Sequence, residues 1–239
     1  MLQMPMIPNL SLLPPLSRFK AVAFDYDGTI ADRGRMDHAT ESALGSLRRA
    51  GFRLVLVSGR RLENLRQICG VLELFEAVVL ENGAVSFNPE NGIAQLIAPP
   101  IDTRFLADML RELPGEPLFV GRSMLATAAE NRGCVEVTIA LGGYDLDVIT
   151  CGRRVLVLPK GTNKASGLSH ALAGMNLSRD QVVAVGDEEN DIELLSGCGL
   201  AVAVGNAAPR LKAIADLVLS GQSGQSVQYL VDMLLQGAG

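Results

Sequence analysis

Two aspartates, Asp25 and Asp27, end an apolar run in the segment VAFDYDGTI, residues 22–30. Alternate side chains of a strand point to the same side, so these two carboxylates are expected to lie close together. Taken alone, the segment is somewhat more typical of a solvated strand end that continues into an Asp-Gly turn. Its chemistry therefore depends on which other polar residues the fold brings beside it.

Other polar segments also follow apolar runs, and each has an ordinary structural interpretation. Ser58 can cap a strand-to-helix turn, Asp187 and Asp191 can complement a helix dipole, and Lys164 can be a surface lysine. Ligands of open parallel sheets bind at the carboxyl ends of the strands. A shared chemical role is favoured because all of the segments are expected at that one edge: residues 25–29, 58–60, 81–83, 159–164 and 186–191.

The order of predicted elements is typical of an α/β protein with a Rossmann-like parallel sheet. Continuous apolar runs alternate with segments of helical spacing, which indicates buried strands covered by helices on both faces. The predicted strands are residues 20–24, 53–57, 77–80, 181–185, 200–204 and 217–219. The predicted helices are residues 37–50, 61–72, 164–173, 191–198, 208–215 and 226–235.

The middle of the chain, residues 84–158, has a different pattern and is predicted to be an inserted α+β unit outside the parallel sheet. Its sequence is typical of two hairpins, one helix and one strand, at residues 86–97, 144–158, 102–113 and 119–128 respectively. Residues 131–141 occupy the place of a second helix, yet their β-branched residues favour a strand, so both alternatives stay open.

The polar residues at the predicted sheet edge suit phosphoryl transfer. Three or four carboxylates at one edge are unfavourable unless a cation neutralises them, and all-oxygen ligands suit Mg²⁺. A hydroxyl group, a lysine and backbone amides in glycine turns suit the oxygens of a phosphate. An aspartate can then act as nucleophile and form an aspartyl-phosphate.

These residues give the chain a resemblance to the haloacid dehalogenase (HAD) superfamily, specifically to its Cof-like, type IIB-capped phosphatases. The family motif DxDGT is similar to residues 25–29, its serine motif to Ser58 in LVLVSGR, its lysine motif to Lys164 in LPKGTNKASGL, and GDxxND to residues 186–191. The motifs occur in the family's order, and the resemblance extends from about residue 20 to the end.

The resemblance implies a division into domains. Residues 18–83 and 159–239 would form the HAD core and residues 84–158 a type IIB cap, after a poorly ordered leader at residues 1–17. The segment ENGA at residues 81–84 looks like the family's boundary between core and cap. The short cap resembles those of phosphoglycolate and mannosylphosphoglycerate phosphatases.

The resemblance also implies a role for each matching residue. Asp25 would be the nucleophile and Asp27 the general acid and base. The residues that would bind phosphate are Ser58, Gly59, Lys164 and Asn190, and those that would hold Mg²⁺ are Asp25, Asp27 through its backbone carbonyl, Asp187 and Asp191. Candidates for the rim of the site are Asn82, Arg122 and Arg132. Lys160 is the rival of Lys164, which is preferred because it opens a helix.

The leading hypothesis is a Mg²⁺-dependent phosphatase acting on a small phosphorylated metabolite, either a sugar phosphate or a phosphoglycolate-like acid. A phosphomutase of the same superfamily is the alternative, although the compact segment GDEENDIELL favours hydrolysis. A non-catalytic binding module on the HAD scaffold is a third hypothesis. Such modules usually lose a nucleophile or a metal ligand, and neither is missing here.

Composition excludes several other classes of function. The net charge of −5 and the scarcity of aromatic residues, with 3 Tyr, 7 Phe and no Trp, argue against a nucleic-acid partner. The four cysteines form no CxxC pair, so buried free thiols are predicted rather than zinc ligands or disulfides. The apolar start contains four prolines and no basic segment, and no later run could span a bilayer, so a cytoplasmic protein is predicted.

Overall fold

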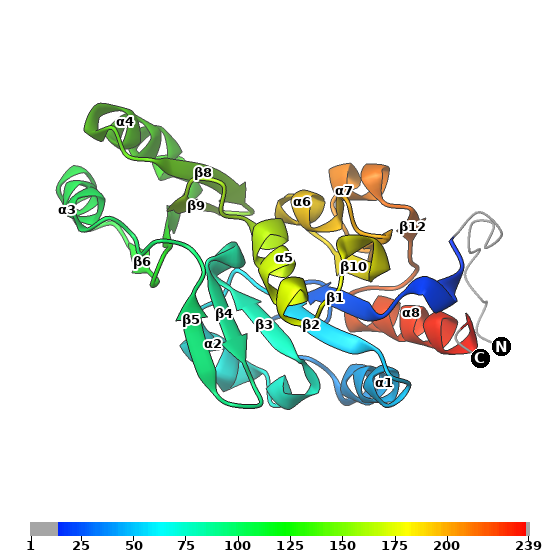
Figure 1. Ribbon diagram of the computed structural model, residues 1–239. Helices are drawn as coiled ribbons and strands as arrows, with labels where there is room; N and C mark the ends of the chain where they lie inside the picture. The colour runs from blue at the N-terminus through cyan, green and yellow to red at the C-terminus, as the bar shows by residue number, and fades with distance from the viewer. Residues whose placement is uncertain (1–13, 238–239) are drawn as a thin grey trace.

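The computed structural model describes residues 14–237, which form two β-sheets with helices packed on them (Figure 1). The larger sheet has eight strands in the order β12-β11-β10-β1-β2-β3-β4-β5, and the smaller has four in the order β6-β7-β9-β8. The strands from β12 to β3 are all parallel. The predicted α/β class with a parallel sheet is therefore confirmed.

The strands β1, β2, β3, β10 and β11 at the centre of the larger sheet are short and almost completely buried. Every residue of β1 is buried, as a parallel strand covered on both faces requires. The eight strands are β1 (Ala21–Asp25), β2 (Arg53–Val57), β3 (Ala77–Leu80), β4 (Val85–Asn88), β5 (Ile93–Leu96), β10 (Val182–Gly186), β11 (Leu200–Ala203) and β12 (Leu217–Val218).

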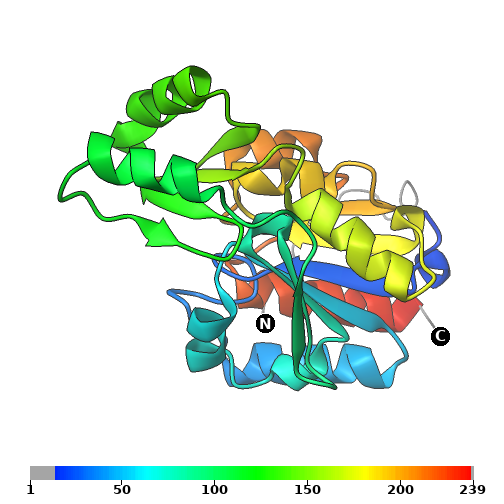
Figure 2. The same cartoon turned by 60° about the vertical axis from the view of Figure 1, so that its left-hand side comes forward.

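Helices cover both faces of this sheet (Figures 1 and 2). Helices α1 and α8 pack against each other on one face, while α5 and α6 pack together on the other. The helices around the sheet are α1 (His38–Arg49), α2 (Leu62–Ile68), α5 (Lys164–Gly174), α6 (Ile192–Leu195), α7 (Pro209–Ile214) and α8 (Gly224–Gly237). None of the helices within residues 14–237 is long and apolar enough to cross a membrane.

The start of α5 is fixed by a reciprocal cap. The Asn163 side chain accepts a hydrogen bond from Ser166 N at 2.9 Å, and Asn163 N donates to Ser166 Oγ at 3.0 Å. Because this capping box ends the loop at Asn163, Lys164 becomes the first residue of the helix. The capping box thus determines that Lys164, whose side chain is buried, lies at the first position of α5.

The hairpin β4–β5 corrects the prediction that the insertion begins at residue 84. Strand β4 pairs antiparallel with β3, and β5 pairs with β4, so the hairpin extends the larger sheet. Val85 and Phe87 are buried in the main core, whereas Ile93 and Leu96 on the edge strand are exposed. The hairpin covers the open edge of β3, a tertiary requirement that its own sequence does not reveal.

The smaller sheet has its own hydrophobic core. Its strands are β6 (Phe119–Val120), β7 (Leu125–Ala128), β8 (Leu146–Cys151) and β9 (Arg154–Pro159), and its helices are α3 (Thr103–Glu112) and α4 (Arg132–Gly142). Alternate residues of β9 face opposite ways: Val155 and Val157 join this core, while Leu156 and Leu158 join the main one.

The structure refines one prediction for the inserted unit and decides another that was left open. The predicted strand at 119–128 is an antiparallel pair, β6 and β7, closed by a hydrogen bond of 2.7 Å from Gly121 N to Met124 O. The ambiguous segment 131–141 is helical, because α4 buries Val135 against the other elements of the smaller core. Tertiary packing there overrides β-branched propensity.

Two further predictions, the leader at residues 1–17 and the buried cysteine thiols, agree with the structure only in part. Of the predicted leader, residues 1–13 lie outside the described residues, whereas Leu16–Arg18 form a short 3-10 helix. All four cysteines are free thiols, but only Cys69 is buried.

Gly83 provides a test of how tightly β3 and α5 are joined. Its φ is +108°, and a Cβ there would lie 1.9 Å from the backbone carbonyl of Asn163. We expect Gly83→Ala to lower the free energy of unfolding by about 3 kcal/mol, from left-handed strain and overpacking together. Urea denaturation followed by circular dichroism measures this change.

Gly51→Ala is the matched control for this prediction. Gly51 has a φ of +95° but has open space around the position of a Cβ, so its substitution should cost only the conformational penalty of about 1 kcal/mol. Equal losses in the two variants would show that the contact between Gly83 and Asn163 contributes nothing.

Candidate active site

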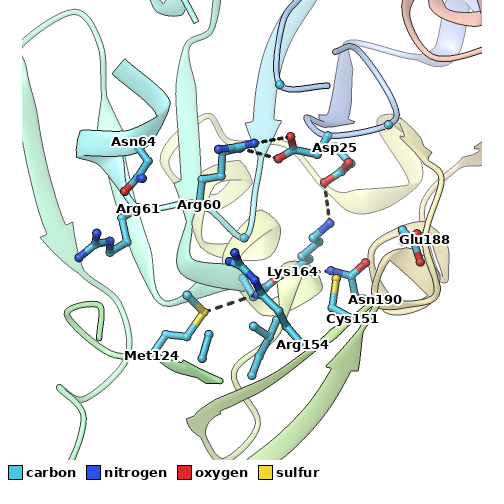
Figure 3. Close-up of a pocket in the computed structure, with 18 of the residues that line it drawn as sticks. Asp25, Arg60, Arg61, Asn64, Met124, Cys151, Arg154, Lys164, Glu188 and Asn190 are labelled. Carbon is cyan, nitrogen blue, oxygen red and sulfur yellow. Dashed lines mark hydrogen bonds and ion pairs between the residues drawn. The ribbon is translucent and has the colours of Figure 1, made fainter. Parts of the chain in front are cut away.

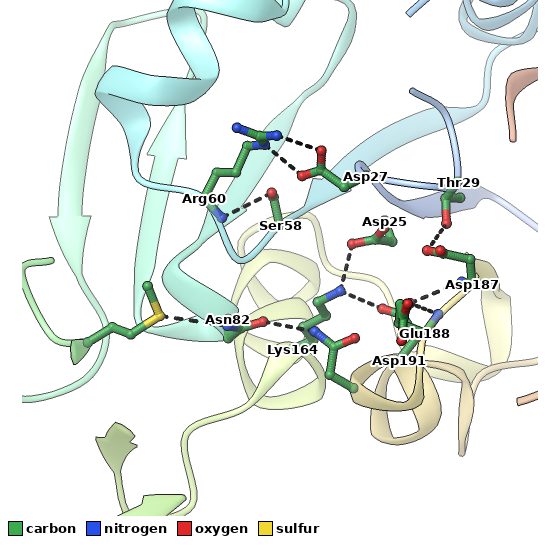
Figure 4. Close-up of polar contacts among 12 residues, drawn as sticks. Asp25, Asp27, Thr29, Ser58, Arg60, Asn82, Lys164, Asp187, Glu188 and Asp191 are labelled. Carbon is green, nitrogen blue, oxygen red and sulfur yellow. Dashed lines mark hydrogen bonds and ion pairs between the residues drawn. The ribbon is translucent and has the colours of Figure 1, made fainter. Parts of the chain in front are cut away.

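The carboxyl edge of the larger sheet brings together polar side chains from distant parts of the chain (Figure 4). Each comes from the end of a strand or the start of a helix, as the sequence patterns predict for an open parallel sheet. They are Asp25 at the end of β1, Ser58 after β2, Asn82 after β3, Lys164 at the start of α5, and Asp187 and Asp191 after β10.

Lys164 lies between two buried carboxylates. Its Nζ is 2.6 Å from Asp25 Oδ1 and 2.6 Å from Asp191 Oδ1. Burial by itself lowers the pKa of Lys164, but Asp191 and Asp25 outweigh that effect, and the pKa is raised. The lysine is therefore held as a cation, and it can neutralise a negative charge at this point.

The aspartates carry more negative charge than Lys164 balances. Burial raises the pKa of Asp25 well above its ordinary value; Lys164 opposes this shift, while Asp191 and Asp187 add to it. Burial, followed by repulsion from Asp191, raises the pKa of Asp187 from 3.8 to about 7. A cation bound among these groups would relieve the cost of burying them as carboxylates.

Three of the aspartates are arranged so that they could share such a cation. Asp25, Asp187 and Asp191 are buried, and each offers a carboxylate oxygen within 4.8 Å of the others. A set of hard oxygen ligands with surplus negative charge fits a divalent metal such as Mg²⁺. Asp27, which is predicted to bind the metal through its backbone carbonyl, contributes no carboxylate to this cluster.

The position of Asp187 is fixed by the turn that follows Asp25. Thr29 Oγ1 donates a hydrogen bond of 2.9 Å to Asp187 Oδ1. Gly28 has a φ of +82°, and a Cβ at this residue would lie 2.1 Å from Asp187 Oδ2. The sequence DGT therefore allows the first turn to approach the Asp187 carboxylate closely and to bind it.

Asp191 supports the loop after β10 as well as Lys164. Its Oδ2 accepts hydrogen bonds of 3.1 Å from the backbone N–H groups of Asp187 and Glu188. Its Oδ1 is bound to Lys164, and the residue is completely buried. Asp191 thus orients the groups around it through both carboxylate oxygens.

Asp27 lies in a different environment from Asp25. The guanidinium of Arg60 donates two hydrogen bonds to its carboxylate, at 2.6 Å from Nε and 2.7 Å from Nη2. Asp27 is also partly exposed, with 45% of its side chain accessible. The sequence patterns assign no role to Arg60, although this residue lies two positions after Ser58 in the segment LVLVSGR.

The predicted phosphate-binding residues lie around the same point. Ser58 is buried, and its Oγ accepts a hydrogen bond of 3.1 Å from Arg60 N. Gly59, Asn82 and Asn190 line the adjoining cavity. The Oδ1 atom of Asn190 is buried and has no hydrogen-bond partner within residues 14–237, while its Nδ2 donates to Asn82 Oδ1 at 3.4 Å.

Three basic side chains that the sequence offers as candidates lie outside the site. Lys160 is exposed and pairs with Asp145 at 3.4 Å, whereas its rival Lys164 is at the site. Arg132 bonds to Glu136 on its own helix, and Arg122 lies 3.9 Å from Glu63. Neither arginine lines the cavity, so neither is placed to contact a ligand there.

A cavity of about 570 Å³ separates the sheet edge from the smaller sheet (Figure 3). The larger sheet and its loops contribute the aspartates, Lys164 and several arginines. The inserted unit contributes a mostly apolar wall with one arginine: Phe119, Met124, Ala126, Cys151, Gly152, Arg154 and Leu156. Burial raises the pKa of the Cys151 thiol to about 11, so this cysteine remains protonated at neutral pH.

Glu81 connects the sheet edge with the inserted unit. Its buried carboxylate accepts hydrogen bonds from the backbone N–H groups of Arg122 at 3.1 Å and Ser123 at 3.0 Å, in the turn between β6 and β7. Its own N–H donates to Arg60 O at 3.1 Å. No local sequence signal indicates this role, because the partners of Glu81 are about forty residues away, with a separation of 41 for Arg122.

Comparison with known proteins agrees with this geometry. Residues 22–127 and 148–230 match the family of haloacid dehalogenase-like hydrolases. Phosphoglycolate phosphatase 1 of Saccharolobus solfataricus is 30% identical, covering 91% of this chain and 96% of its own. The phosphoglycolate phosphatase of Methanothermobacter thermautotrophicus is 29% identical, covering 89% and 97% respectively.

The fold is also shared with solved structures. A sugar phosphatase of HAD subclass IIB superposes with a TM-score of 0.73 at 20% identity, covering 91% of this chain and 98% of its own. The chain therefore belongs to the haloacid dehalogenase-like hydrolases, as a phosphatase of the Cof-like type. The resemblance seen in its motifs is confirmed.

The raised pKa of Asp187 predicts that the metal-free protein is more stable at pH 6 than at pH 8. A group whose pKa is about 7 when folded and 3.8 ordinarily binds a proton on folding, so its contribution is lost as the pH rises through 7. We expect the free energy of unfolding to be about 1 kcal/mol higher at pH 6. Urea denaturation in the presence of a chelator measures this difference.

The same measurement on Asp187→Asn provides the control. This variant lacks the titrating group, so the difference between the two pH values should shrink. An unchanged difference would assign the effect to other groups.

Removal of the Glu81 carboxylate should loosen the turn between β6 and β7. Glu81→Ala leaves the buried N–H of Ser123 and the partly buried N–H of Arg122 without their acceptors, so amide exchange in residues 119–128 should accelerate by about tenfold or more. Hydrogen exchange with mass spectrometry measures the rate. Asp216→Ala, which removes an acceptor from Ala201 N within the larger sheet, should leave that segment unchanged. Equal exchange in wild type and Glu81→Ala would contradict the connection.

Proposed function

We propose that this protein is a Mg²⁺-dependent phosphatase that hydrolyses a small phosphorylated metabolite through an aspartyl-phosphate intermediate. The observation that carries the proposal is the position of Asp25, whose carboxylate lies beside Lys164 and faces a cavity lined by Gly59 and Asn190. A nucleophilic carboxylate, a fixed cation and a cavity for the ester thus meet at one point.

In the first step, the Asp25 carboxylate attacks phosphorus and the bond to the leaving oxygen breaks. In this proposal Lys164, whose Nζ lies 2.6 Å from Asp25 Oδ1, balances charge on the phosphoryl oxygens, and the hydroxyl group of Ser58 donates a hydrogen bond to one of them. When bound, Mg²⁺ would be held by Asp25, Asp187 and Asp191 and would neutralise the phosphate and its surroundings. The leaving alcohol takes up a proton as it departs.

Asp27 is the residue proposed to supply that proton and later to accept one from water. Its bidentate contact with Arg60 occupies both carboxylate oxygens. To act as an acid, Asp27 must therefore release at least one of these contacts when substrate enters. In the second step, water attacks the aspartyl-phosphate, Asp27 accepts its proton, and Asp25 is regenerated.

The relatives support a small phosphorylated substrate. Two curated relatives are named phosphoglycolate phosphatases, and a structural neighbour is a sugar phosphatase. A phosphomutase would use the same aspartyl-phosphate but would return the phosphoryl group to the sugar. Analysis of the products distinguishes the two reactions, because only hydrolysis releases inorganic phosphate.

Release of inorganic phosphate tests the proposal. The wild-type protein with Mg²⁺ should hydrolyse phosphoglycolate or a hexose phosphate, and Asp25→Asn should lower the rate by about 10³-fold or more because it removes the nucleophile. A colorimetric phosphate assay over a panel of phosphate monoesters measures both rates.

Chelation is the second arm of this experiment. EDTA should abolish phosphate release, and added Mg²⁺ should restore it, whereas Asp187→Asn should need a higher Mg²⁺ concentration. Wild-type protein that releases no more phosphate than Asp25→Asn from any ester would overturn the proposed function.

A further inference from the structure

The positive charges lining the cavity are unevenly paired. Lys164 and Arg60, on the side where the aspartates lie, each bind a carboxylate. Arg33, Arg61 and Arg154 also line the cavity, yet none of them has a carboxylate within 4.0 Å in the described part of the chain. Arg33 and Arg61 come from loops of the larger sheet and Arg154 from the inserted unit, so the cavity holds arginines that no carboxylate of residues 14–237 neutralises. Besides the aspartates, Glu188 is the acidic residue that also lines it.

Arg154 is the member of this group that the inserted unit supplies. It is the first residue of β9, where it pairs with Ala128 of β7 and Cys151 of β8. Because side chains alternate along a strand, Arg154 lies on the same face as Leu156, which lines the cavity, and opposite to the buried Val155. Figure 3 shows its side chain extending from the strand into the cavity.

Neighbouring groups hold Arg154 in position, and its guanidinium N–H groups have no hydrogen-bond acceptor among residues 14–237. Its guanidinium carbon lies 4.7 Å from the centre of the Phe119 ring, a cation-π contact that uses the face of the guanidinium. The strand β6 that carries Phe119 is itself bound to the core, because Arg61 Nη1 donates to Val120 O at 3.0 Å. The planar edge of Arg154 is thus available for two parallel hydrogen bonds to an anion.

We infer that Arg154 binds a second anionic group of the substrate, so that the preferred substrate is a phosphate monoester whose leaving group carries a carboxylate or another phosphate. This inference rests on the proposed function and adds to it the charge of the leaving group. The phosphoryl group lies at Asp25 and Lys164, and the second anion lies against the opposite wall. Esters with an uncharged leaving group leave the Arg154 guanidinium unpaired.

A binding experiment on the catalytically silent protein tests the inference without requiring turnover. In an Asp25→Asn background with Mg²⁺, we compare the dissociation constants of phosphoglycolate, the bisphosphate of ethylene glycol and 2-hydroxyethyl phosphate by calorimetry. Phosphoglycolate and the bisphosphate, which carry a second anionic group, should bind about tenfold more tightly than 2-hydroxyethyl phosphate, whose leaving group is neutral. Adding Arg154→Gln should remove that preference and leave the affinity for 2-hydroxyethyl phosphate within about twofold.

Arg153→Gln is the matched control. Arg153 is the neighbouring residue of the β8–β9 turn, is exposed, and does not line the cavity, so its loss removes the same charge without removing the contact. Equal dissociation constants for the esters with and without a second anion would overturn the inference. Equal effects of Arg153→Gln and Arg154→Gln on those constants would also overturn it. The relative affinity of the two charged esters shows whether the second anion is a carboxylate or a phosphate.

Turnover separates this inference from the proposed function. With Asp25 intact, Arg154→Gln should lower kcat/KM by about tenfold for the two esters that carry a second anion. It should change kcat/KM for 2-hydroxyethyl phosphate little. Absence of phosphate release from all three esters overturns hydrolysis, while the calorimetric preference still decides the role of Arg154.

Discussion

Three buried aspartates, two of which bind one lysine, set the electrostatic condition on which the rest of this structure depends. Lys164 binds Asp25 and Asp191, but among residues 14–237 the hydroxyl group of Thr29 is the one side-chain donor to Asp187. Such a cluster is costly to bury unless the surrounding backbone fixes each group. The capping box before Lys164 and the amides bound to Asp191 provide that fixation.

Asp25 and Asp27 are only two residues apart, yet the fold places them in contrasting surroundings. Asp25 is enclosed beside the lysine and the other acids, whereas Asp27 is half-exposed and held by an arginine from the next loop. Two carboxylates with different environments can perform different parts of one reaction. The turn at Gly28 produces this contrast, because it leads the chain away from the sheet directly after Asp27.

The sequence predicts the larger sheet well because its signals are local. An uninterrupted apolar run such as Ala21–Phe24 indicates a buried strand whatever its neighbours are, and the order of runs indicates parallel pairing. The segments of the site could also be predicted, since they follow these strands. Their individual roles in catalysis stay predictions, and the predicted start of the insertion fails because strand pairing at the β3 edge is a tertiary property.

Side-chain partners were the least predictable feature. Arg60 and Asp27 are separated by 33 residues, and Glu81 and Ser123 by 42, so no periodicity connects them. The helix α4 was ambiguous for a related reason. Its Val135 and Thr138 have weak helical propensity, and their burial within the smaller sheet's unit decides the conformation.

The smaller sheet separates two tasks between its faces. One face, with Leu125, Val155 and Val157, packs into a core that the aspartates never touch. The other face, with Ala126, Arg154 and Leu156, presents side chains to the cavity. Substitution of Arg154 therefore leaves the smaller core and the contacts of Lys164 in place, whereas Ala126 and Leu156 also pack in the main core. A lineage of such proteins could acquire new substrates by altering a few positions on one side of two strands while its chemistry stays intact.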